Sequence, residues 1–274
     1  MVMTRRPLVL ARSGRLRWEM GPVREPDYRS ERIAVVAHWS DRPQVSRSVH
    51  ELAAQLVDNG YDVIVSSAAE CPQELIWPDL PGGVSVYRRD NIGYDFGSWA
   101  HALATWPGIR DTGTTIMVND SLVGPFAPLR PVLDRLDGDD HPVWGLVSTT
   151  QDTAHLQSHF MAYRDGILNH PKLRRFWSGV RVEPTKRDLI LRYEIGLGRL
   201  LRRSGIGYGA GFDWERVVPP GANPTSQGWR RLMLMGFPFV KRELVLRPPD
   251  EVADVGDVPG VVRDLYGVDV MEWV

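Results

Sequence analysis

A β-α-β pattern near the amino terminus constrains the fold most. Residues 33–39 read I-A-V-V-A-H-W, an apolar run of strand length that predicts a strand buried on both faces. Apolar residues at helical spacing follow over 45–59, and Asn59-Gly60 is a typical helix end. A second strand is expected over 61–66. Two strands joined through a helix indicate a parallel sheet with a right-handed crossover, so the sequence predicts the α/β class.

The alternation of strands and helices continues along the chain. Further strands and helices are expected at 84–87, 115–118 and 143–148, and at 98–106, 129–136, 171–180 and 186–204. Residues 155–163 fit either a strand or a helix. The glycine-rich stretch 205–211 follows a helix rather than a strand, so we expect a flexible loop and not a dinucleotide-binding loop. We expect one domain over 31–246, an irregular arginine-rich extension over 1–30 and a C-terminal extension over 247–274.

Composition excludes several classes of protein. The net charge of −1 over 274 residues argues against a nucleic-acid partner. The single cysteine, Cys71, cannot form an internal disulfide, which favours the cytoplasm. The apolar stretch 232–240 is too short to cross a bilayer, and the run 7–11 is too short for a secretory signal. Arginines and acidic residues interleave over 1–32, so this segment is a solvated extension or an arm that touches an anionic membrane surface.

Polar residues gather on either side of the strand expected at 115–118. The loop 90–97 reads D-N-I-G-Y-D-F-G, and the strand ends in Asn119-Asp120-Ser121. Small residues let the backbone approach a ligand closely. An acidic residue at the carboxyl end of a buried strand is where open α/β sheets place their ligand chemistry. This stretch therefore predicts a site for the diphosphate and sugar of a nucleotide-sugar donor.

Asp120 is the first candidate catalytic residue. A carboxylate is a suitable ligand for Mg²⁺ or Mn²⁺, and the ion would neutralise a leaving diphosphate. Asn119 and Ser121 are expected to serve as neutral oxygen ligands or to orient the site. The alternative is an ordinary turn, because Asn-Asp-Ser is a common turn composition.

The loop before the helix at 98–106 supplies candidates for donor binding. They are Asn91, Gly93, Tyr94 and Asp95. Asp95 would hold a sugar hydroxyl or lie near the metal, and Tyr94 would stack on a base or sugar. The alternative is a β-turn before a helix, with Asp95 or Ser98 as the N-cap.

Glu194 is the candidate general base. It lies near the edge of the apolar face of the helix expected at 186–204. Partial burial there would raise the pKa of its carboxyl towards the range of a general base. The alternative is an exposed glutamate that pairs with Lys186, Arg187 or Arg192.

Three further residues are candidates for contact with the sugar or the acceptor. They are His155, Gln157 and Trp144. Tryptophan is common where proteins stack on sugars, but it also fills cores. His155 and His159 have the i,i+4 spacing that on a helix would face one metal ion, yet the glutamate that H-E-x-x-H requires is absent.

Several blocks, taken in order, carry a resemblance to a known family. They are N-I-G-Y-D-F-G-S-W (91–99), V-N-D-S-L-V-G-P-F (118–126), W-G-L-V-S (144–148), H-L-Q-S-H-F (155–160), R-Y-E-I-G-L (192–197), and N-P-T with P-F-V-K-R-E-L (223–225, 238–244). Over residues 31–246 the chain resembles the rhamnan synthesis protein F family, glycosyltransferases of bacterial cell-surface polysaccharide assembly.

The resemblance implies a GT-A-like fold, with a nucleotide-binding α/β half and a less regular acceptor half. In enzymes of that fold an N-x-G loop precedes an acidic metal motif, and Asn91-Ile92-Gly93 and Asn119-Asp120-Ser121 match that order. The metal motif is usually D-x-D, so N-D-S leaves dependence on Mg²⁺ or Mn²⁺ open. In inverting enzymes of this fold a carboxylate base comes from a later helix, where Glu194 stands.

The expected protein is a cytoplasmic GT-A glycosyltransferase that uses a nucleotide-diphosphate sugar, with rhamnose as the sugar that the family name implies. Its acceptor would be a growing or lipid-linked saccharide, reached by peripheral contact with the inner face of the membrane. The alternative is a non-catalytic saccharide-binding or scaffold protein of the same fold, which the missing D-x-D favours. A Rossmann-type oxidoreductase fits less well, because H-W-S-D rather than a glycine-rich loop ends the first strand.

Overall fold

The computed structural model describes residues 6–22, 30–252 and 254–274. Its strands are β1 (Arg17–Met20), β2 (Arg32–His38), β3 (Asp62–Ser67), β4 (Val84–Arg88), β5 (Thr114–Asn119), β6 (Leu122–Val123), β7 (Val143–Thr149), β8 (His155–Leu156), β9 (Phe160–Arg164), β10 (Tyr208–Phe212) and β11 (Val240–Lys241). Within these described residues, nine strands form one mixed sheet in the order β1-β4-β3-β2-β5-β9-β7-β10, with β8 paired to β7. Strands β6 and β11 form a separate antiparallel pair.

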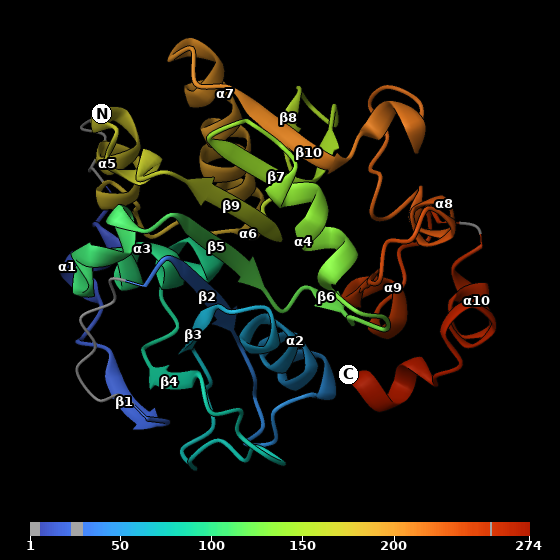
Figure 1. Ribbon diagram of the computed structural model, residues 1–274, viewed down its shortest axis with the longest axis horizontal. Coiled ribbons are helices and arrows are strands. Elements are labelled where there is room, and N and C mark those ends of the chain that lie inside the picture. Colours follow the sequence, from blue (N-terminus) through green and yellow to red (C-terminus); the bar gives the residue numbers. More distant parts are fainter. Residues whose placement is uncertain (1–5, 23–29, 253) are drawn as a thin grey trace.

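Helices cover both faces of the sheet. They are α1 (Val9–Arg12), α2 (Arg47–Asp58), α3 (Tyr94–Thr105), α4 (Arg130–Asp137), α5 (Pro171–Ser178), α6 (Lys186–Leu189), α7 (Ile195–Arg203), α8 (Trp229–Leu234), α9 (Arg242–Leu246) and α10 (Val258–Tyr266), with short turns η1 (Pro107–Asp111), η2 (Ile167–Asn169), η3 (Ile190–Glu194), η4 (Trp214–Arg216), η5 (Val255–Asp257) and η6 (Val270–Trp273). Helices α2 and α4 pack on one face, and α3, α5 and α7 on the other (Figure 1). None of the helices in the described residues has the length and apolar character needed to span a membrane.

Strand β2 lies at the centre of the parallel half of the sheet. Its residues alternate between the two cores, with Ile33 and Val35 in one and Ala34 and Val36 in the other. β3 pairs with it on one side and β5 on the other, both in parallel. The chain passes from β2 through α2 to β3, and later from β4 through α3 back to β5. The strand order therefore reverses between β2 and β5, and open α/β sheets bind ligands in the crevice at such a point.

The second half of the sheet brings more segments to the same edge. β9 is antiparallel to both β5 and β7, and β10 is parallel to β7. Strands β5, β7 and β10 consequently run in one direction. The segments that follow their carboxyl ends line the same edge as the end of β2.

The strands and helices expected between residues 31 and 204 occur in the predicted order, with shifted boundaries. Helix α3 starts four residues earlier than expected, at Tyr94. Its N-cap is Gly93 in the left-handed region (φ 82°), not Asp95 or Ser98, and Tyr94 itself has a φ of 52°. The ambiguous stretch 155–163 forms β8 and most of β9.

Two expectations about irregular segments are wrong. The glycine-rich stretch 205–211 enters strand β10, and a Cβ on Gly211 would lie 2.6 Å from the Trp144 ring, which accounts for the glycine. The N-terminal extension holds α1 and also β1, which pairs antiparallel with β4. The rest of that extension, 1–5 and 23–29, lies outside the described residues.

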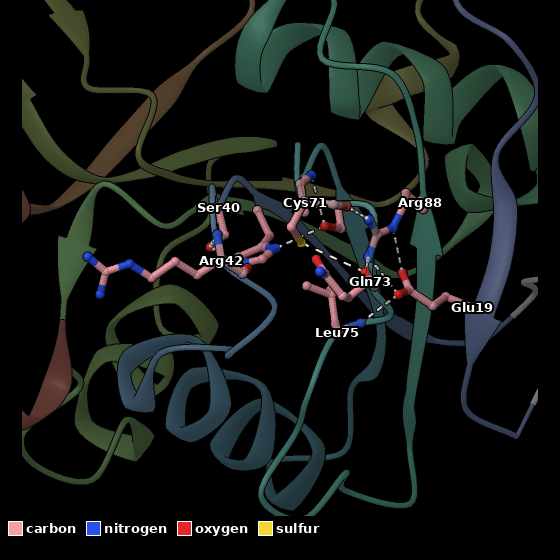
Figure 2. Close-up of polar contacts among 10 residues, drawn as sticks. Glu19, Ser40, Arg42, Cys71, Gln73, Leu75 and Arg88 are labelled. Carbon is pink, nitrogen blue, oxygen red and sulfur yellow. Dashed lines mark hydrogen bonds and ion pairs between the residues drawn. The ribbon is translucent and has the colours of Figure 1, made fainter.

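An ion pair with little exposure to solvent joins β1 to the end of β4 and binds the loop that follows β3 (Figure 2). Arg88 donates from Nε to Glu19 Oε2 at 3.1 Å and from Nη2 to Oε1 at 2.7 Å. The backbone N–H of Leu75 donates to the same carboxylate at 2.7 Å, and Arg88 also donates to the carbonyl oxygens of Cys71 and Gln73. The pair thereby fixes this loop beside the carboxyl ends of β3 and β4.

Removing the carboxylate of this pair should destabilise the fold. Glu19→Ala leaves the Arg88 guanidinium without its counter-ion and the Leu75 N–H without its acceptor. The site has little contact with solvent, since the side chains of Arg88 and Glu19 are 14% and 7% exposed. Because breaking a buried ion pair costs about 3–5 kcal/mol, we expect urea denaturation to show a fall of about 3 kcal/mol in the free energy of unfolding. Glu51→Ala is the control, since its pair with Arg47 is solvent-exposed and contributes less than about 0.5 kcal/mol. Equal losses for the two variants would contradict this role of Glu19.

Candidate functional site

Asp120 follows β5 and lies beside the end of β2. Its Oδ2 accepts a hydrogen bond from the backbone N–H of Trp39 at 2.9 Å, and its own N–H donates to the Ala37 carbonyl at 3.2 Å. From a third segment, Arg242 donates its Nε to the Asp120 carbonyl at 2.8 Å and its N–H to the Ser121 carbonyl at 2.7 Å. Three segments far apart in the sequence thus meet at a partly exposed carboxylate.

Asn119 links the end of β5 to the first turn of α3. Its Nδ2 donates to Asp95 Oδ2 at 2.6 Å. Its Oδ1 accepts from the N–H of Ser121 at 3.1 Å and from the Ser121 hydroxyl. The side chain is buried and both ends of its amide are engaged within the protein. Asn119 therefore fixes Asp95 relative to Ser121, while its part in binding a ligand stays a prediction.

The Asp95 carboxyl resists ionisation. Burial first, and the negative charge of Asp120 second, raise its pKa to about 7. Glu194 adds to this effect, while the hydrogen bond from Asn119 and the positive charge of Lys186 oppose it. A carboxyl with this pKa exchanges its proton near neutral pH, which is the property of a general acid or base.

Glu194 is fixed at the end of η3, a π-helical turn that interrupts the expected helix 186–204. Its Oε1 lies 3.4 Å from Nε2 of His155, and its Oε2 accepts from the N–H of Ser158 at 2.8 Å and from the Ser158 hydroxyl. His155 Nδ1 lies 2.7 Å from the carbonyl oxygen of Thr153. Single π-helical turns often occur at functional sites, because they rotate one residue away from the regular helical spacing.

The expectation that burial raises the pKa of Glu194 is wrong. Burial acts in that direction, but the hydrogen bonds from His155 and Ser158 and the charge of His155 outweigh it, so the pKa is lowered. The alternative, a surface glutamate paired with a neighbouring cation, does not describe the residue either, because its side chain is 17% exposed and Arg192 pairs with Glu183. Glu194 is an ionised carboxylate that holds the segment before β9.

The donor-loop candidates lie around the start of α3. Asn91 is exposed and donates from Nδ2 to Glu70 Oε1 at 2.9 Å. Gly93 is buried, and a Cβ there would lie 2.5 Å from Val9 Cγ2, so only glycine fits. Tyr94 is 43% exposed and directly precedes Asp95 in the chain.

The residues expected to contact the sugar are all buried. Trp144 is 0% exposed and packs in the core against Phe160, with ring centroids 6.2 Å apart, so its predicted role in sugar binding is wrong. His155 and Gln157 are 3% and 6% exposed. Gln157 donates from Nε2 to Asn223 Oδ1 at 3.1 Å, within a polar network of the protein itself.

Side chains that bind metals are sparse at this site. Across residues 6–22, 30–252 and 254–274, no group of three or more His, Cys, Asp or Glu side chains is arranged to hold a metal ion. A single carboxylate suits Mg²⁺ or Mn²⁺ when phosphate and water oxygens complete the coordination. Of the metal ligands expected from the sequence, Asp120 is the one carboxylate, and it would supply a single protein oxygen to such an ion.

Some residues of this site were not apparent from the sequence. Arg242 lies 122 positions from Asp120, and although it falls inside the block at 238–244, no role at the site was assigned to it. Trp39 was assigned only to a strand, yet it is 47% exposed and its backbone N–H donates to Asp120. Ser158 falls inside the block at 155–160, so the family resemblance was the signal that marked its surroundings.

Comparison with known proteins identifies the family of the chain. The family model described as Rhamnan synthesis protein F matches residues 84–257. The chain belongs to the rhamnan synthesis protein F family. The matched region of this family member includes Asp95, Asp120 and Glu194, whereas Trp39 precedes it. Membership relates the chain to the synthesis of polysaccharide.

Two relatives extend the comparison of this rhamnan synthesis protein F family member. Virulence protein VirA of Vibrio anguillarum is 28% identical over 235 residues, which cover 70% of this chain and 76% of VirA. The uncharacterized protein y4gN of Sinorhizobium fredii is 23% identical over 138 residues, which cover 48% of this chain and 36% of y4gN. The similarity to VirA thus extends well beyond the segment around Asp120.

Substitution of Asp95 by asparagine should stabilise the protein at alkaline pH. The carboxyl has a pKa of about 7 in the folded protein, against 3.8 for an ordinary aspartate, so the wild-type free energy of unfolding falls as pH rises from about 4 through 7. Asparagine cannot ionise and still offers an oxygen to Asn119. At pH 8 we expect Asp95→Asn to gain roughly 2 kcal/mol, less than the full shift implies because the side chain is partly exposed, and to gain less at pH 5.

Urea denaturation at both pH values measures this effect, with Asp41→Asn as the control because Asp41 is 70% exposed. The control should not differ from wild type at either pH. Loss of stability in Asp95→Asn at pH 8 would show that the carboxyl is not held in an unfavourable ionised state.

Proposed function

We propose that this protein is a glycosyltransferase of GT-A type that transfers a sugar from a nucleotide-diphosphate donor to a saccharide acceptor in cell-surface polysaccharide assembly. The observation that carries the proposal is the contact between Asp120 and the backbone of Trp39, where the strand order reverses between β5 and β2. Ligands of open α/β sheets bind at this point. The family description, which names the synthesis of rhamnan, supports the substrate class.

The donor would lie across the ends of β2 and β5. Mg²⁺ or Mn²⁺ bound with the diphosphate at Asp120 would supply charge neutralisation for the leaving group. Lys186 and Arg242 add positive charge near the same carboxylates. Tyr94 offers its exposed ring for stacking on the base or sugar, and the amino end of α3 favours negative charge. Rhamnose is the sugar that the family name implies, and a growing or lipid-linked saccharide at the cytoplasmic face of the membrane is the acceptor.

Asp95 suits the proton transfer better than Glu194. In a direct transfer the acceptor hydroxyl oxygen bonds to the anomeric carbon, the bond from that carbon to the diphosphate breaks, and the hydroxyl proton passes to a base. Asp95 has a pKa of about 7, near the optimum for this task. The pKa of Glu194 is lowered, and its oxygens already accept hydrogen bonds from other residues. In the proposed mechanism Asp95 takes the proton and Glu194 positions the segment before β9.

Kinetics of two isosteric variants separate these roles. Asp95→Asn should bind nucleoside diphosphate like wild type but lose turnover by about 10²–10⁴-fold, the contribution of general base catalysis. Glu194→Gln should reduce turnover less and should lower the melting temperature, because Ser158 and His155 lose a charged acceptor. Initial rates and calorimetric binding measure the two effects. Normal turnover in Asp95→Asn, with none in a stable Glu194→Gln, would assign the base to Glu194.

Ligand-induced thermal stabilisation tests the donor class. The probes are UDP, dTDP, GDP, CDP and NADH, each with and without Mn²⁺. A ligand present at about 100 times its Kd stabilises the folded state by about 2.7 kcal/mol, so one nucleoside diphosphate should raise the melting temperature by several degrees. Asp120→Ala should remove the part of the shift that depends on Mn²⁺. A flat response to every nucleotide would favour the alternative, a non-catalytic saccharide-binding or scaffold protein.

A further inference from the structure

Residues 171–203 form a strongly basic part of the surface. They include ten arginine or lysine residues and three acidic ones, while the whole chain has a net charge of −1. Two of the acidic side chains are withdrawn from solvent, since Glu183 is 0% and Glu194 17% exposed. The exposed cations are Lys172, Arg174, Arg175, Lys186, Arg187, Arg192, Arg199, Arg202 and Arg203. The outer surface of α5, η3 and α7 is consequently almost free of negative charge.

The amino-terminal segment adds to this surface. The N–H of Val9 donates to the Val180 carbonyl at 2.8 Å, and the N–H of Val182 donates to the Pro7 carbonyl at 3.0 Å. Arg6 reaches the buried carboxylate of Glu183, which Arg192 also contacts. We call Arg6 and the exposed cations of 171–203 the basic face; Arg6 and Arg192 are linked within it through Glu183.

Positive charges on and beside the basic face lie close enough to repel one another. After burial, the charge of Arg174 is the largest cause of the lowered pKa of Arg110. The charges of Arg6, Arg181 and Arg192 all lower the pKa of the Tyr193 hydroxyl, which burial raises. Like charges gathered in this way make the local electrostatic potential positive, which attracts an anionic partner.

We propose that the basic face docks on the anionic surface of a phospholipid membrane. A cation held near an anionic bilayer strengthens binding by about fivefold, so the nine exposed cations provide ample attraction. Leu191, which is 39% exposed, stands between Arg187 and Arg192 and adds an apolar group of the kind that enters the headgroup layer. This docking goes beyond the transfer reaction and does not depend on it.

The aromatic residues of this region favour a membrane over a nucleic acid. Single-stranded nucleic acids are bound where exposed aromatic rings alternate with cations. Here Phe176 contacts both Trp177 and Tyr193, with ring centroids 5.1 and 5.9 Å apart, so the rings pack against one another. Trp177 and Tyr193 are buried, and the basic face offers charge without a stacking surface.

The proposed docking places the candidate site close to the bilayer. Lys186 and Glu194 belong to the same run of helix as Arg192 and Arg199. The charges of Lys186 and Glu194 shift the pKa of the Asp95 carboxyl. Arg192 and Arg199 are exposed on the same run of helix. A membrane on the basic face would thus hold a lipid-linked saccharide within a short reach of the site.

Vesicle flotation tests the proposal on the full chain. The probes are phosphatidylcholine vesicles with and without phosphatidylglycerol, each in low and high salt. The test variant is Arg175→Gln/Arg199→Gln/Arg203→Gln, which keeps Arg192 because its partner, the buried Glu183, would otherwise lose a counter-ion. Because three cations are removed, binding to anionic vesicles should weaken on the order of 100-fold.

A matched control removes the same charge from another part of the molecule. Arg216→Gln/Arg231→Gln/Arg263→Gln changes three exposed arginines on η4, α8 and α10 and should bind the vesicles like wild type. Thermal melts verify that both variants fold. Salt-sensitive binding that only the basic-face variant loses supports the proposal.

Three outcomes would overturn the proposal. They are absence of wild-type binding to phosphatidylglycerol vesicles, equal loss in both variants, and tighter binding to a single-stranded oligonucleotide than to the vesicles. None of these bears on sugar transfer, which is assayed with a water-soluble acceptor in the absence of lipid. Failure of the docking and failure of the proposed function are therefore distinguished.

Discussion

The reversal of strand order at β2 is the constraint on which the candidate site depends. Parallel strands pair with β2 on both sides, so the two crossover connections leave in opposite directions and neither covers the ends of β2 and β5. Backbone N–H and C=O groups beyond the last hydrogen bonds of the sheet still need partners. The N–H of Trp39 donates a hydrogen bond to the Asp120 carboxylate, and the N–H of Asp120 donates one to the Ala37 carbonyl. The main chain thus fixes the position of the carboxylate before any ligand arrives.

The sequence predicted the parallel half of the sheet well, because its periodicity follows directly from burial. Residues 33–37 are apolar without interruption since both faces of β2 are covered. Elsewhere local patterns were ambiguous for identifiable reasons. The π-helical turn Ile190–Glu194 keeps the apolar spacing of a helix, so the pattern does not reveal it. Strand β10 was mistaken for a loop, because Gly209 and Gly211 make room for Asp139 and Trp144 rather than for a turn.

The candidate site was predictable only where its residues flank one helix and one strand. Asp95 and Asn119 lie at the start of α3 and the end of β5, and the structure joins them by a hydrogen bond. The contact of Arg242 with Asp120 arises from the tertiary fold, and no spacing in the sequence encodes it. Trp144 was predicted to contact the sugar but lies in the core. Composition does not distinguish a core tryptophan from one that stacks on a sugar.

Two carboxyls of this site differ in pKa because different numbers of donors face them. Burial and the negative charge of Asp120 favour the protonated form of Asp95, and the single hydrogen bond from the Asn119 amide does not outweigh them. Glu194 is partly buried too, but Ser158 gives it two hydrogen bonds and His155 faces its other oxygen, so the ionised form is favoured. Burial acts in the same direction on both carboxyls, and the donors that face Glu194 account for the difference. The negative charge of ionised Glu194 also raises the pKa of Asp95. The residue that holds the segment before β9 therefore helps Asp95 to keep its proton.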